Sequence, residues 1–121
     1  MAVCIAASAC GRAPAPRADV TVEWNLTPLE PDVDRDIVAR VIVFDPSSRP
    51  VGGATLQIEA HMSHPGMAPV IAPVSEHSNG VYAATLRLTM AGRWILFVNG
   101  HLSDGRTISK KLGEATVRPS G

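Results

Sequence analysis

The chain has 121 residues, which fits one domain, and its 11 basic and 11 acidic side chains give a formal net charge of zero. This balance argues against a nucleic-acid partner and against a polybasic membrane-binding segment. Hydrophobic residues make up 45% of the chain but aromatic residues only 4%, so Val, Ile, Leu and Ala must form most of the core.

The first ten residues, MAVCIAASAC, are small and apolar. They resemble the end of a bacterial lipoprotein signal, in which small residues precede the cysteine that receives lipid, so Cys10 is the predicted lipidation site. The segment departs from that pattern, because Ala7 stands where Leu is usual and no positive region comes first. A disordered N-terminus is the alternative. Residues 11–18, GRAPAPRA, predict an extended Pro/Ala-rich tether.

We expect residues 19–118 to form the folded domain, held by a lipid anchor on the periplasmic or outer face of a bacterial membrane. The two cysteines, Cys4 and Cys10, both precede this domain. The domain therefore has no disulfide, no thiolate metal site and no cysteine nucleophile. Thiols tend to oxidise outside the cytosol, which leaves Met and His as the usable soft ligands there.

Alternating apolar residues predict strands in the first half of the domain. Residues 19–26 show strict alternation, whereas residues 37–44, IVARVIVF, are nearly all apolar and predict a buried central strand. Residues 54–62 alternate again. This phase directs Met62 towards the core and His61 towards the solvent.

Residues 63–79 predict a long loop, part of which packs or forms a short edge strand. Residues 81–89 alternate, and Met90 falls in their inward phase. Residues 93–99, RWILFVN, predict a second continuous apolar strand, and residues 107–117 a weaker strand pair. About seven short strands, together with ten Pro and ten Gly for the turns, predict an all-β fold, an immunoglobulin-like antiparallel β-sandwich.

Residues 61–67, HMSHPGM, place two imidazoles and two thioethers beside a Pro-Gly turn. Thioether sulfur suits Cu(I), and imidazole suits copper in either oxidation state. A further methionine opens the motif MAGRW at residues 90–94, although the sequence does not determine whether the two segments meet. The candidate copper ligands are His61, Met62, His64, Met67 and Met90.

Each candidate ligand also has an ordinary structural interpretation. Met62 and Met90 lie in inward phases, and methionine is a common filler of gaps in protein cores. His61 and His64 can simply be solvated. Met67 follows Pro-Gly in a polar loop, where a packing role is less natural.

From Val41 to Asn99 the chain resembles the YtkA-like domain family, and the FixH family has a similar layout. The matching pieces are DPSSRPV at 45–51, PGM at 65–67, NGVY at 79–82 and, most specifically, MAGRW at 90–94. The resemblance implies an extracytoplasmic, membrane-tethered sandwich that handles copper and delivers it to a membrane copper enzyme such as a respiratory oxidase.

By position, Met62, Met67 and Met90 fall where methionines of the YtkA-like family lie. The two histidines, His61 and His64, depart from the usual loop, and they would admit Cu(II). The resemblance and the ligand types together favour Cu(I) over Cu(II).

We therefore expect an extracytoplasmic copper-binding protein, a Cu(I) carrier or metallochaperone that contacts the membrane only through its lipid anchor. The alternative is an immunoglobulin-like envelope accessory or interaction module without metal. An enzyme is not expected, because no GxSxG, HExxH or phosphate-binding glycine loop occurs. The remaining histidines, His77 and His101, stand alone near turns and are expected to be exposed.

Overall fold

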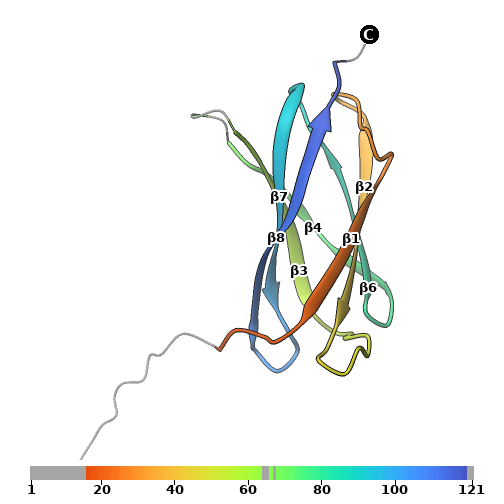
Figure 1. Cartoon of the computed structure of the whole chain (residues 1–121), viewed down its shortest axis with the longest axis vertical. Coiled ribbons are helices and arrows are strands. Elements are labelled where there is room, and N and C mark those ends of the chain that lie inside the picture. The colour runs from red at the N-terminus through yellow and green to blue at the C-terminus, as the bar shows by residue number, and fades with distance from the viewer. Residues whose placement is uncertain (1–15, 64–65, 67, 120–121) are drawn as a thin grey trace, which may run out of the picture.

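A computed structural model describes residues 16–63, 66 and 68–119, which form two stacked four-stranded sheets and no helix (Figure 1). The eight strands are β1 (Thr21–Thr27), β2 (Asp36–Phe44), β3 (Thr55–Met62), β4 (Val70–Pro73), β5 (Ser75–Ser78), β6 (Val81–Arg87), β7 (Gly92–His101) and β8 (Thr107–Val117). One sheet has the order β1-β2-β6-β5 and the other β4-β3-β7-β8.

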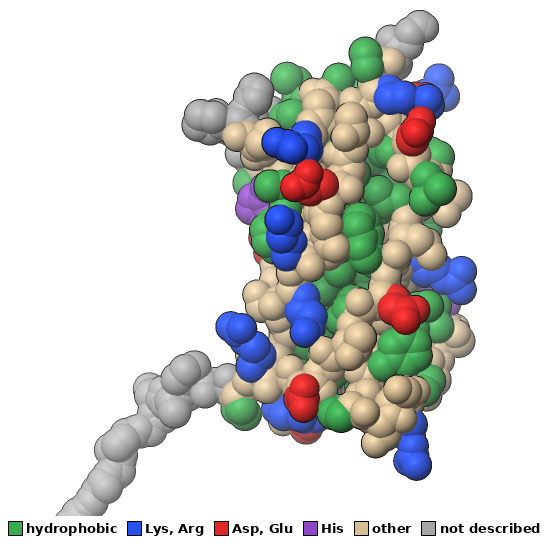
Figure 2. Space-filling model, viewed as in Figure 1, with side chains coloured by type: hydrophobic (Ala, Val, Ile, Leu, Met, Phe, Trp, Pro, Cys, Tyr) green, Lys and Arg blue, Asp and Glu red, His purple; other side chains and the backbone are tan. Residues whose placement is uncertain are grey.

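All neighbouring strands in both sheets are antiparallel, which confirms the predicted immunoglobulin-like sandwich. The described residues contain no helix that could cross a membrane. The N-terminal segment with Cys10 and the first part of the Pro/Ala-rich stretch lie outside the described residues. On the face shown in Figure 2, basic and acidic side chains are interspersed, in keeping with the zero net charge.

Residues 68–79 contain two short strands, and the described part of the chain forms eight strands instead of about seven. Strand β4 pairs with β3, and β5 pairs with β6 in the other sheet, so the chain changes sheets at Val74. Neither strand alternates between apolar and polar residues, since β4 reads VIAP and β5 reads SEHS, so this signal could not predict them. Residues 107–117 form one strand with a register shift opposite Leu96 and Phe97, not the expected pair.

The two nearly continuous apolar segments form interior strands of their sheets, as predicted for residues 37–44, but each is buried on one face only. In β2, Val41 is fully buried, whereas Val38 is 39% exposed. In β7, Leu96 is buried, whereas Ile95 and Phe97 are half-buried on the outer face. A two-layer sandwich covers only the inner face of each sheet, so the outward apolar side chains stay partly exposed.

Residues 16–18 of the expected tether lie against β8. The Ala18 amide donates to the Thr107 carbonyl at 2.7 Å, and the Thr107 amide donates to the Pro16 carbonyl at 2.9 Å. Ala18 itself is 7% exposed. Residues 16–18 of the expected tether are therefore part of the folded domain.

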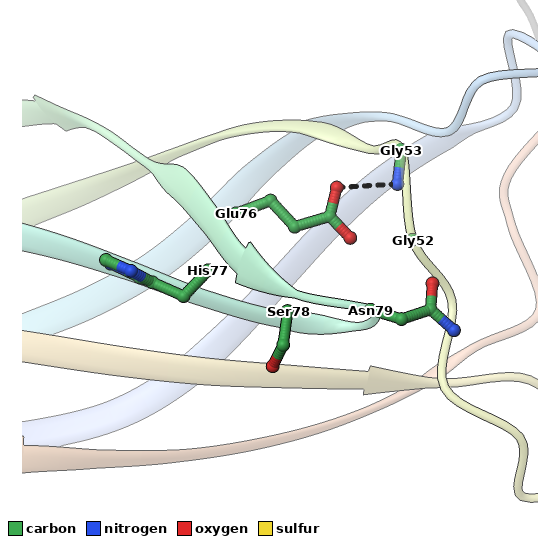
Figure 3. A pocket seen from close by; sticks show the side chains of 6 residues that line it. All are labelled: Gly52, Gly53, Glu76, His77, Ser78 and Asn79. Carbon is green, nitrogen blue, oxygen red and sulfur yellow. Dashed lines mark hydrogen bonds between the residues drawn. The ribbon is translucent and has the colours of Figure 1, made fainter.

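A buried tyrosine fixes the loop between β2 and β3. The Tyr82 hydroxyl donates to the Val51 carbonyl at 2.6 Å and accepts from the Ala54 amide at 3.1 Å. The neighbouring Glu76 carboxylate accepts from the Gly53 amide at 2.9 Å, as Figure 3 shows. These bonds fix residues 51–54 of the loop at one end of the sandwich.

The opposite end, uppermost in Figure 1, carries the methionine segments. Strand β3 ends there at Met62, whose register partner is Trp94 near the start of β7. Residues 28–35 reach the same end, because the Asp34 amide donates to the Leu88 carbonyl at 3.0 Å. We call Met62 and the turn 88–91 the methionine end.

Candidate metal site

Met62 is the last residue of β3 and points to the inner side of its sheet, as the alternation predicted. Its side chain is half-buried and packs against the edge of the core. Its terminal methyl carbon lies beside Gly92, where an added Cβ would be only 3.1 Å away. The thioether of Met62 is thus next to the start of β7, two residues after Met90.

Met90 is 42% exposed, which corrects the inward position that its phase predicted. Strand β6 ends at Arg87, and Leu88 is the last residue that enters the core. Beyond it the chain turns, so the strand phase no longer applies to Met90. The thioether therefore lies at the surface and not in the core.

The turn that carries Met90 is anchored by the buried Trp94. The indole Nε1 of Trp94 donates to the Met90 carbonyl at 3.0 Å, and the Trp94 side chain is only 1% exposed. Trp94 was expected in the core, and the structure confirms it. A buried ring thus fixes the backbone of Met90 while its side chain remains accessible.

The structure brings the two methionine segments to one end of the sandwich, which the sequence left open. Of the loop between β3 and β4, His64 and Met67 lie outside the described residues. Gly66 has a φ of 85°, in the left-handed region that favours glycine after proline in a tight turn. Of the five candidate ligands, the structure therefore describes His61, Met62 and Met90.

His61 faces outward, as predicted, and this places it on the opposite side of the sheet from Met62. Its Nε2 lies 3.1 Å from Oε1 of Glu59. Its ring meets that of Phe97 edge to face, with centroids 5.4 Å apart. The structure therefore separates His61 from the methionine end.

Glu59, which was not among the candidate residues predicted from the sequence, contacts His61. Its Oε2 accepts hydrogen bonds from Asn99 Nδ2 at 2.7 Å and from Gln57 Nε2 at 3.1 Å. The hydrogen bond with His61 is the main cause that lowers the pKa of Glu59; burial opposes it, and the two amides add to the lowering. The sequence offered one signal for Glu59, which is that it lies two residues before His61 in an alternating strand and so shares its face. The contact with Asn99 could not be predicted without the register of β3 and β7.

The other histidines, His77 and His101, are exposed, as expected. Within the described residues, no three His, Cys, Asp or Glu side chains gather as a metal-binding group. Methionine is not among these four residue types, and its thioether is a further ligand for soft metal ions. Among the described residues, Met90 is exposed and Met62 is half-buried next to the start of β7.

A sequence model of the YtkA-like family matches residues 17–99. No curated protein matches the chain. Among solved structures, the chain is similar to the crystal structure of the Lin-41 filamin domain, with a TM-score of 0.60 and 16% sequence identity over 88% of this chain and 98% of that one. At this identity the similarity concerns the fold alone.

Proposed function

The chain belongs to the YtkA-like family, and from that premise we propose that it is an extracytoplasmic copper-binding protein, a carrier or metallochaperone for Cu(I). The observation that carries the proposal is the surface position of Met90 on a turn fixed by Trp94. A methionine that only filled a gap would be buried. An exposed thioether on an ordered turn is instead available to a soft ion.

The proposed ligands are the thioethers of Met62 and Met90, together with Met67 and His64 from the adjoining loop. His61 is left out of this set, because it lies on the other face of β3. Copper is the cargo here. A site at the end of the sandwich lets a recipient protein approach and take the ion by exchange of ligands.

On this proposal the recipient is a membrane copper enzyme such as a respiratory oxidase. Lipidation of Cys10 would hold the carrier at the same membrane surface, on its periplasmic or outer face. More than one acyl chain is needed for stable anchoring. We propose no catalytic activity for the chain.

The test is an anaerobic titration in which the protein, with Cys4 and Cys10 replaced by Ser so that no thiolate binds the ion, competes for Cu(I) with a chromogenic chelator. Wild type is compared with the triple variant Met62→Leu, Met67→Leu, Met90→Leu, and with His101→Ala as the control. We expect wild type and control to bind one equivalent that the triple variant does not. Equal competition by wild type and triple variant, or none by wild type, contradicts the proposal.

A second candidate, an interaction module without metal, is favoured by one observation. Leu29, in the segment that reaches the methionine end, is 79% exposed. Together with the exposed Met90 at the same end, Leu29 would supply the apolar side chains of an interaction patch. This candidate predicts that the protein does not compete with the chelator for Cu(I), so the same titration separates the two functions.

A further inference from the structure

We infer that the outer face of the sheet β4-β3-β7-β8 has a second metal-binding position, at which His61 Nε2 and Glu59 Oε1 bind one divalent transition-metal ion. Imidazole with carboxylate is a donor pair for Zn²⁺ and Cu²⁺ and a poor one for Cu(I). This position is independent of the proposed Cu(I) site, since its residues lie on the opposite face of β3 from Met62.

The separation of the two donor atoms matches that of neighbouring ligands on one ion. His61 Nε2 and Glu59 Oε1 are 3.1 Å apart. With metal–nitrogen and metal–oxygen distances of about 2.05 and 2.1 Å, this separation gives an angle of roughly 97° at the ion. The angle lies between square-planar and tetrahedral values. An ion between the two atoms would replace the Nε2 proton and lie off the line that joins Nε2 and Oε1, so the imidazole would turn to direct its lone pair at the ion.

The surrounding residues already orient both ligands. Asn99 and Gln57 donate to Oε2 of Glu59, which fixes the carboxylate and leaves Oε1 for the ion. The edge-to-face contact with Phe97 restrains the ring of His61. Such outer hydrogen bonds are what hold ligands in place at metal sites.

The position is open to solvent. The side chains of His61 and Glu59 are 40% and 23% exposed. They line a shallow depression together with Ile95, Phe97 and Asn99. Water can therefore fill the remaining coordination positions, and two protein ligands predict modest affinity, with Cu²⁺ bound more tightly than Zn²⁺.

The proposal is tested by calorimetric titration of the full chain, in which Cys4 and Cys10 are replaced by Ser so that no thiolate binds the ion, with Zn²⁺ and then with Cu²⁺, in a buffer that does not bind metals. Wild type is compared with Glu59→Gln and His61→Ala, and the control is His101→Ala, which removes an exposed histidine from the same sheet. We expect one equivalent in wild type and control. Each of the two site variants should bind at least tenfold more weakly.

Binding by Glu59→Gln that equals that of wild type would overturn the inference, as would equal loss in the His101→Ala control or no Zn²⁺ binding by wild type. The triple methionine variant separates this position from the proposed function. It should keep divalent binding while it loses Cu(I). Loss of Cu(I) binding in His61→Ala would show that the two sites are one, and would overturn the inference.

Discussion

Removal of one hydroxyl, in Tyr82→Phe, should destabilise the domain by about 2 kcal/mol. The hydroxyl of this buried side chain bonds both the Val51 carbonyl and the Ala54 amide. Phenylalanine fills the same space but leaves both backbone groups without that partner. An unsatisfied buried group costs about 1–3 kcal/mol, and the half-buried positions of Val51 and Ala54 let water replace part of the loss.

The assay is urea unfolding followed by tryptophan fluorescence, with Thr85→Val as the control. Thr85→Val removes a hydroxyl from an exposed position of the same strand. We expect an unchanged m-value, a lower midpoint for Tyr82→Phe and a melting temperature reduced by roughly 10 °C. A difference between the two variants of less than about 0.5 kcal/mol would refute the reasoning, because the loop would then not depend on this hydroxyl.

Burial raises the pKa of Tyr82, the single tyrosine of the chain, so tyrosinate absorbance of the folded protein should appear at a higher pH than that of the protein unfolded in urea, and the free energy of unfolding should fall as pH rises above about 10. Folded and unfolded protein that titrate at the same pH would contradict this. In thermal unfolding, Gly100→Ala should be less stable than Gly105→Ala by at least about 1 kcal/mol, because a Cβ at residue 100 would collide with the Thr55 carbonyl, whereas a Cβ at residue 105 meets open space. Equal losses of stability would mean that only the backbone conformation of the two glycines matters. Trp94→Phe removes the donor to the turn, so hydrogen exchange of amides 88–91 should accelerate more than that of β2, and uniform acceleration would argue against the anchoring role.

Alternation predicted which side chains of β1, β3 and β6 face the core. It placed Met62 inward and His61 outward correctly. Alternation failed at Met90, because we extended the alternating pattern of residues 81–89 beyond Arg87, where β6 ends. Strand β6 ends at Arg87, and the turn that follows is held by the hydrogen bond from Trp94 to the Met90 carbonyl, a contact that alternation does not reveal.

The Glu59 cluster shows a different limit of the sequence. The neighbours Gln57, Glu59 and His61 share the outward phase of β3, so their common face could have been predicted. The hydrogen bond from Asn99 depends on the register between β3 and β7, which aligns Gln57 with Asn99. Register is set by packing across the sheet and by loop geometry, which a single sequence does not display.

The crossing at Val74 protects one side of the sandwich from pairing with other chains. Strands β4 and β5 form the edges of the two sheets on that side, and each offers only four residues of backbone. Pro73 lacks an amide proton, and all four side chains of β5 are exposed and polar. Short, proline-containing and polar edges discourage strand addition and aggregation. A partner protein would therefore meet this domain through its ends or its outer faces, and not by extending a sheet there.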